Sequence, residues 1–149
     1  MRPSHLPLRL VTGAFILNSG LGKRALPPEA AAGMQGMASA AVPPVKDMEP
    51  ATFGKALSTG EMALGAALLS PFVSPVVAGA ALTAFSATLL RMWWLTPGMR
   101  EPGTAKPTQE GTGIAKDVWR AGIGLALVTD GLLDGAKRTA RSTRKALPV

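Results

Sequence analysis

The chain contains no cysteine and no tyrosine, and His5 is its one histidine. Without cysteine it can form no disulfide, thiolate metal site or iron–sulfur cluster, and it has no cysteine nucleophile. A lone histidine excludes bis-histidine haem ligation and makes a histidine-based catalytic triad improbable. We therefore expect neither a metal site nor a set of catalytic residues within this chain.

Charge is missing from a long internal stretch, because the twenty-nine residues 62–90 carry no charged side chain. One helix needs about 20 apolar residues to cross about 30 Å of hydrocarbon, so this run is too long for a single span. The motif Ser-Pro-Phe-Val-Ser-Pro at 70–75 holds two prolines, which remove backbone donors and disfavour helical geometry. The stretch predicts a hairpin of two transmembrane helices turning at 70–75. The alternative is a buried helical hairpin in a soluble domain.

Four membrane spans are predicted in all. The second and third, 51–70 and 76–94, flank the turn, and the third ends in an Arg-Met-Trp-Trp sequence typical of a membrane interface. A short first span covers 6–22, for which a signal peptide is the alternative interpretation. The fourth, 114–133, carries several charges that must face other helices, and its alternative is an interfacial amphipathic helix.

Two longer segments connect these spans. Residues 26–50 lie between proline pairs and contain many alanines, which predicts a short helix on or near the membrane surface. Residues 96–113 are rich in proline, glycine and threonine and are predicted to form a loop.

Basic residues gather at the end of the chain, and five of them account for most of the net charge of +7. Beside a membrane segment, such a tail indicates a cytoplasmic location and attraction to anionic lipid head groups rather than nucleic-acid binding. With four spans, both termini lie in the cytoplasm, and 26–50 and 96–113 face outward. The five cations follow Asp134 and are Lys137, Arg138, Arg141, Arg144 and Lys145.

The expected fold class is therefore all-α: an integral four-helix bundle of the plasma membrane, with a long outer loop between its first two spans. We expect a transmembrane domain at 1–134 and a basic cytoplasmic tail at 135–149. A mean hydropathy of +0.23 fits this assignment.

Ionisable residues that lie at the same depth in different predicted spans are expected to contact one another. Arg9 and Asp130 both fall at the inner side, so a salt bridge between them is predicted. At the outer side, Lys23 is expected to meet Asp117 and Lys116. Charged groups in a membrane are costly unless they are partnered, so these residues should form a charge network.

Glu61 falls about halfway along the second span, which makes it the best candidate for a functional residue. Asn18 is its expected neighbour. One interpretation is that Glu61 is a hydrogen-bonded structural link between helices, and the other is that it handles a proton or a substrate.

Three spans carry recognisable motifs: Arg9-xxx-Gly13-x-Phe15-xxxx-Gly20-xx-Lys23, Gly60-Glu61-xxx-Gly65 and Lys116-Asp117. In this order and spacing, they resemble the DoxX-like family of small four-helix membrane proteins, in its actinobacterial form, from about Leu8 to Leu133. That resemblance implies membership of a membrane-associated oxidoreductase complex, because the family is named after the small membrane subunit of an archaeal thiosulfate:quinone oxidoreductase. It marks Arg9, Gly13, Gly20, Lys23, Glu61 and Asp117.

Three functions fit these observations. The first is an accessory or structural subunit of a larger membrane complex, without catalytic activity of its own. The second is a quinone-linked oxidoreductase component that binds a quinone near Glu61, Asn18 and Lys23. The third is a small transporter or lipid-binding protein. No side chain carries redox chemistry, so any cofactor would be a bound quinone or lipid.

Overall fold

The computed structural model describes residues 5–146, and all the regular structure in this range is helical apart from one isolated bridge between Arg100 and Pro107. The predicted all-α class is confirmed. The helices are α1 (His5–Gly22), α2 (Pro28–Ala41), the 3-10 helix η1 (Pro43–Asp47), α3 (Pro50–Leu69), α4 (Pro75–Leu95), α5 (Thr112–Ala115) and α6 (Asp117–Ala146).

Prolines mark where several helices begin. Pro28, Pro50 and Pro75 stand in the first turns of α2, α3 and α4, where a missing N–H costs no intrahelical bond. At the start of α4 the Ser74 hydroxyl also accepts a hydrogen bond of 3.2 Å from the backbone N–H of Val77. The chain reverses between α3 and α4, at the turn predicted from the two prolines.

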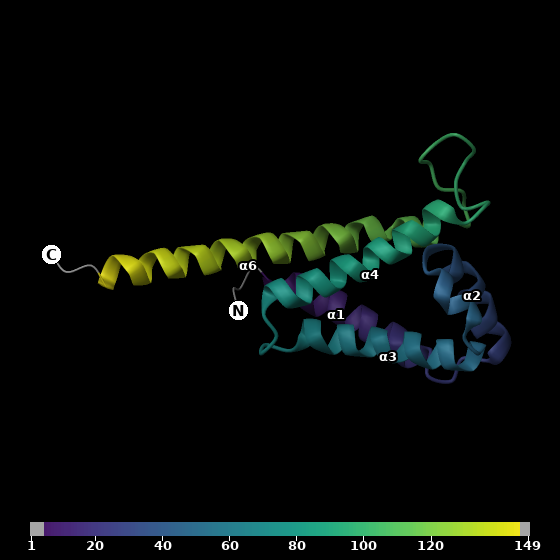
Figure 1. Cartoon of the computed structure of the whole chain (residues 1–149), viewed down its shortest axis with the longest axis horizontal. Coiled ribbons are helices and arrows are strands. Elements are labelled where there is room, and N and C mark those ends of the chain that lie inside the picture. The colour runs from purple at the N-terminus through teal and green to yellow at the C-terminus, as the bar shows by residue number, and fades with distance from the viewer. Residues whose placement is uncertain (1–4, 147–149) are drawn as a thin grey trace.

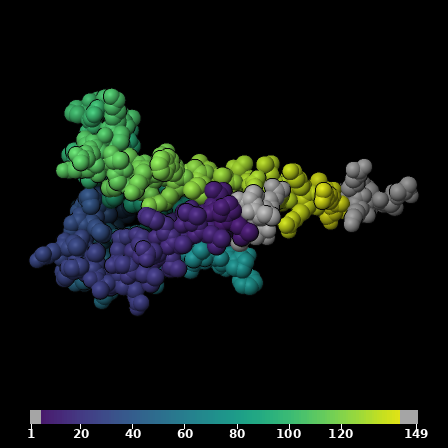
Figure 2. All heavy atoms as spheres, turned by 180° about the vertical axis from the view of Figure 1, so that it is seen from behind, coloured from purple at the N-terminus to yellow at the C-terminus, as the bar shows by residue number. Residues whose placement is uncertain are grey.

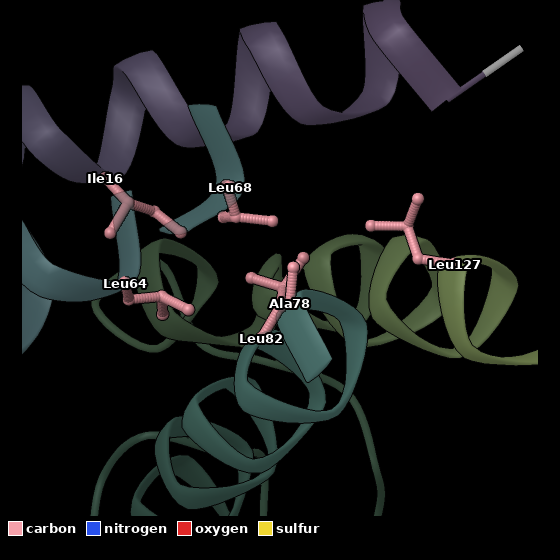
Figure 3. Close-up of a cluster of buried hydrophobic side chains, with 6 residues drawn as sticks. All are labelled: Ile16, Leu64, Leu68, Ala78, Leu82 and Leu127. Atoms are coloured by element: carbon pink, nitrogen blue, oxygen red, sulfur yellow. The ribbon is translucent and has the colours of Figure 1, made fainter. Parts of the chain in front are cut away.

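The long helices form two antiparallel pairs (Figure 1). α1 packs along α3, and α4 packs along α6, whereas α3 and α4 touch little although a short turn connects them. The two pairs meet in one apolar cluster, in which the labelled side chains of four helices point toward a common centre (Figure 3). These residues are Ile16, Leu64, Leu68, Ala78, Leu82 and Leu127.

Within each pair, glycines let the backbones approach closely. A Cβ atom added to Gly65 of α3 would lie 2.6 Å from the backbone nitrogen of Leu17 in α1. A Cβ atom added to Gly79 of α4 would lie 2.6 Å from the carbonyl oxygen of Gly124 in α6. Small residues at such crossings are typical of helices that associate in lipid.

The segment between α1 and α3 is a helical cap rather than an open loop. α2 packs against α3 and α4 at the end of the molecule away from the α3–α4 turn (Figure 1). The buried Gln35 amide holds η1 beneath α2, because its Nε2 donates to the carbonyl oxygens of Val45 and Met48 at 2.6 and 2.7 Å. The sequence predicts the short helix but not this link.

α6 is a single helix of 30 residues that continues past residue 134 without a break. Its C-terminal part projects beyond the helix pairs as an isolated rod (Figure 2). Most of its residues from 132 to 142 are exposed.

Among the described helices, α4 alone is long and apolar enough to cross a membrane by length and composition. Charged residues lower the hydropathy of α1, α3 and α6.

Candidate functional site

Arg9 is the most deeply buried charged side chain in the described range, with 1% of its surface exposed. Its guanidinium donates to four carbonyl oxygens at the end of α3 and in the following turn, at 2.7–2.9 Å. One acceptor is Ala67, whose carbonyl would bond residue 71 in a continuing helix, but Pro71 has no N–H to give. Arg9 thus replaces the missing donors and meets the negative end of the α3 dipole. The carbonyls belong to Ala67, Leu68, Ser70 and Val73.

The predicted Arg9–Asp130 salt bridge is not formed. Asp130 Oδ2 instead lies 3.0 Å from Nε2 of His5, one helical turn before Arg9. The reason is that α3 ends beside Arg9 and offers a denser set of acceptors than one carboxylate. The prediction located both residues at the correct end of the bundle but assigned Asp130 the wrong partner.

Lys23 and Glu61 form an ion pair, with 2.8 Å between Nζ and Oε2. The Lys23 side chain is 18% exposed and that of Glu61 is 8% exposed, so the pair is largely shielded from solvent. Lys23 Nζ also donates to the Ser19 hydroxyl at 2.6 Å, one turn back along α1. Two residues of the predicted site, Glu61 and Lys23, therefore lie together.

Asn18, the third residue of that predicted site, is exposed and makes no hydrogen bond to Glu61 in the described range. Successive helical residues are rotated by about 100°, so Ser19 and Lys23 share a face that Asn18 does not. One turn below the ion pair, the buried Ser58 hydroxyl donates to the carbonyl oxygen of Gly20 at 2.8 Å. A polar contact strip thus runs between α1 and α3.

Asp117 is buried at the start of α6, and its carboxylate pairs with Arg120 at 2.7 Å rather than with Lys23. The predicted Lys23–Asp117 contact is therefore wrong. Arg120 lies one turn along the same helix, so its pairing orders no second element. The Arg120 guanidinium also lies 5.0 Å from the ring centroid of Phe15, which links α6 to α1.

A groove of about 520 Å³ opens between α3 and α4, where the helix pairs diverge. Glu61 is its one charged lining residue, and the others are apolar or glycine. The groove is lined by Ala56, Leu57, Gly60, Glu61, Ala63, Leu64, Ala67, Ala81 and Phe85.

The three tryptophans gather around a second groove, of about 830 Å³, at the end of the bundle that carries the loop after α4. Trp93 and Trp94 close α4, while Trp119 stands in the first turn of α6 with 74% of its surface exposed. Arg91 and Lys116 line the same groove. Apolar rings beside cations at one level of a helical bundle are typical of a membrane interface.

Sequence reasoning missed the contact of Ser19 with Lys23 and the burial of His5 beside Asp130. A serine one helical turn from a lysine is a recognisable signal, because the two share a helix face. His5 carried no signal in the sequence beyond its identity.

Comparison with family models, curated proteins and solved structures gave no significant match for this chain. The resemblance to the DoxX-like family accordingly stays a prediction.

Proposed function

We propose that this chain is a small multi-pass protein of the plasma membrane that serves as an accessory or structural subunit of a larger membrane complex. The observation that carries the proposal is the placement of polar and apolar groups. Several ionisable and hydroxyl groups are buried between the helices beside the apolar cluster, whereas many large apolar side chains stand on the outside. In water this outer apolar surface is unfavourable, but in lipid acyl chains cover it, and charged groups are tolerated where they face other helices and have partners.

The outer surfaces of α1, α4 and α6 support a lipid environment. Large apolar side chains that are at least 44% exposed lie along α1 and α6 and at both ends of α4. An exposed apolar surface of this extent marks a membrane or protein contact. These residues include Leu6, Leu10, Val11, Phe15, Leu21, Val77, Trp94, Leu95, Val118, Trp119, Leu125, Leu132 and Leu133.

The buried groups complement this surface, since most of them are partnered within the protein. Arg9 binds carbonyls, Glu61 binds Lys23 and Asp117 binds Arg120. Charges satisfied in this way allow α1, α3 and α6 to accompany α4 across a bilayer, which gives the four predicted spans. α1 begins and α6 ends at the same end of the molecule (Figure 1), as an even number of spans requires. The basic end of α6 would then face the cytoplasm.

The exposed face of α3 supports the proposal that the chain is a subunit of a larger complex. Ala56, Gly60 and Ala63 are exposed on it, and a Cβ atom added to Gly60 would meet nothing within 4 Å. A face of small residues lets another transmembrane helix approach closely. In this proposal a helix of a partner subunit packs there.

Fractionation and copurification test the proposal together. The tagged chain is expected in the membrane fraction after alkaline carbonate washing, and in mild detergent it should elute with other membrane proteins. Gly60→Leu should release those partners, while Gly122→Leu, an exposed glycine of α6 with equal open space, should retain them. Release of the chain by carbonate would refute the membrane assignment. Elution as a lone monomer would refute the subunit assignment.

The groove beside Glu61 favours a second candidate function, a quinone-linked component of a membrane oxidoreductase. An apolar groove with one carboxylate suits an amphipathic ring, and Glu61 would exchange the proton with Lys23 as its neighbour. Organic extraction of the purified complex should then yield a quinone that Glu61→Gln abolishes. A complex that contains no quinone, or retains it fully in the variant, contradicts this candidate.

A further inference from the structure

A third groove, of about 660 Å³, lies at the end of the molecule where α1 begins and α6 starts to project. Its walls come from three helices: His5 of α1, the first residues of α4, and one face of α6. Among the described residues, three cations of α6 and one carboxylate, Asp134, line it. The α6 residues are Gly131, Asp134, Gly135, Lys137, Arg138 and Arg141, and those of α4 are Ser74, Pro75 and Val76.

From this geometry we propose that the groove binds the phosphate head group of an anionic phospholipid. The inference rests on the proposed membrane location and adds a ligand to it. Arg138 and Arg141 are exposed guanidinium groups, which can hold phosphate oxygens through paired N–H donors. The N-terminus of α4 adds the positive end of a helix dipole to the same groove.

His5 supplies an independent indication of a ligand. Its side chain is 3% exposed, and Nε2 is occupied by Asp130. Its Nδ1 is buried without a hydrogen-bond partner in the described structure, although the residue lines the groove. A buried polar atom normally has a partner. Nε2–H donates to the Asp130 carboxylate, so Nδ1 is a donor when the imidazole carries both protons, and a phosphate oxygen in the groove would then accept from Nδ1–H.

The surroundings select a lipid as the source of the phosphate. Leu132 and Leu133 stand more than half exposed on α6 beside the cations, and Phe72 at the neighbouring turn is 95% exposed. Acyl chains can cover these side chains while the head group occupies the groove. Gly131 brings α6 close to α4 at the inner end, because a Cβ atom added there would lie 2.7 Å from Cγ2 of Val76. The groove is therefore narrow at Gly131, where α6 and α4 meet.

The test uses the full-length chain in detergent micelles, with short-chain phosphatidylglycerol as the probe and phosphatidylcholine and inorganic phosphate as comparisons. Labelling with nitrogen-15 histidine gives a single site to observe, since the chain has one histidine. Phosphatidylglycerol is expected to shift the His5 Nδ1 resonance saturably, and phosphatidylcholine to leave it unchanged.

The double variant Arg138→Gln with Arg141→Gln should weaken phosphatidylglycerol binding roughly 25-fold, at about fivefold per cation near a membrane surface. Its control is Lys46→Gln with Lys106→Gln, which removes the same charge from exposed positions outside the groove and should bind like the parent. Circular dichroism checks that both variants fold.

Several results would overturn the inference. Equal weakening in the control variant would mean diffuse charge attraction without a site. If inorganic phosphate saturated the His5 shift at the same concentration as the lipid, the acyl chains would contribute nothing to binding. Stronger binding of a single-stranded oligonucleotide would assign the groove to nucleic acid. A chain that stays in the carbonate-washed membrane yet shows no lipid-dependent His5 shift would defeat this inference while leaving the membrane assignment intact.

Discussion

Lys23, which directly follows α1, and Glu61 of α3 are joined by a 2.8 Å ion pair that is mostly shielded from solvent. Lys23 keeps a second bond to Ser19 and is the more exposed partner, whereas in the described structure Lys23 is the only ion-pair partner of Glu61. Glu61 therefore relies on Lys23 to compensate its charge more than Lys23 relies on Glu61.

Removing either partner of this pair should destabilise the protein to a different degree. Lys23→Met leaves a carboxylate buried, and we expect a loss of about 3 kcal/mol in the free energy of unfolding. Glu61→Gln should cost less, because Lys23 retains Ser19. The double variant should cost less than the two single losses combined. Chemical unfolding in detergent, followed by circular dichroism, measures all three, and simple additivity would show that the pair contributes no coupling.

Arg9→Lys should weaken the α3–α4 turn even though it preserves the charge. A lysine has three N–H donors on one nitrogen and cannot reach four carbonyls spread over the turn. We expect a loss of about 2 to 3 kcal/mol, since hydrogen bonds to charged groups each contribute about 1.5 kcal/mol or more. The matched substitution Arg24→Lys, at an exposed position, should be neutral. Equal effects at both positions would contradict the role assigned to Arg9.

Double-mutant cycles distinguish the two candidate partners of Asp130. His5→Ala and Asp130→Ala should be coupled, by about 0.5 to 1 kcal/mol because the Asp130 side chain is 39% exposed. Arg9→Ala and Asp130→Ala should instead be additive. Thermal unfolding of the three single and two double variants provides the measurement, and the reverse pattern would restore the salt bridge predicted from sequence.

Substitution by alanine should have opposite effects on stability at two glycines that lie five residues apart in α3. Gly65→Ala places a methyl group against the α1 backbone at Leu17, so the helices must separate at a cost of about 1 to 3 kcal/mol. Gly60→Ala meets open space and should stabilise the isolated chain slightly, by up to about 1 kcal/mol of helix propensity. Melting temperatures in detergent compare the two, and equal melting would mean that α1 and α3 are packed more loosely than described.

The tryptophans report on the bilayer directly, since all three surround one groove. In vesicles, lipids brominated near the head group should quench the fluorescence of Trp94 and Trp119 more strongly than lipids brominated at the acyl-chain ends. Single-tryptophan variants assign the signals. Quenching by aqueous iodide alone, with no effect of either lipid, would remove these residues from the membrane.

Local chemistry explains which features could be predicted. Two prolines and a charge-free run were enough to locate the α3–α4 turn, because proline acts on its own backbone. Matching by depth did not pair Lys23 with Glu61, because it placed Lys23 at the outer side with Asp117 and Glu61 halfway along its span. The two residues were grouped only in the predicted quinone site. Asn18 was the wrong neighbour for Glu61 because the choice depends on the rotation of α1 about its axis, which packing against α3 determines through Gly65 and Gly20.

The partners of Arg9 could not be predicted from the sequence for a related reason. Matching charges by depth considers only ionised side chains, whereas the acceptors that Arg9 found are backbone carbonyls exposed by the end of α3. A helix end beside an arginine is visible only when the helices are placed side by side.

The unbroken course of α6 has a mechanical consequence. Thirty helical residues form a rod of about 45 Å, and its first turn holds Asp117 and Arg120 against the bundle. The projecting end and the end that carries these two side chains therefore belong to one stiff helix. A tilt of the projecting end is transmitted along that helix, with no flexible joint between, to Arg120 and to the ring of Phe15.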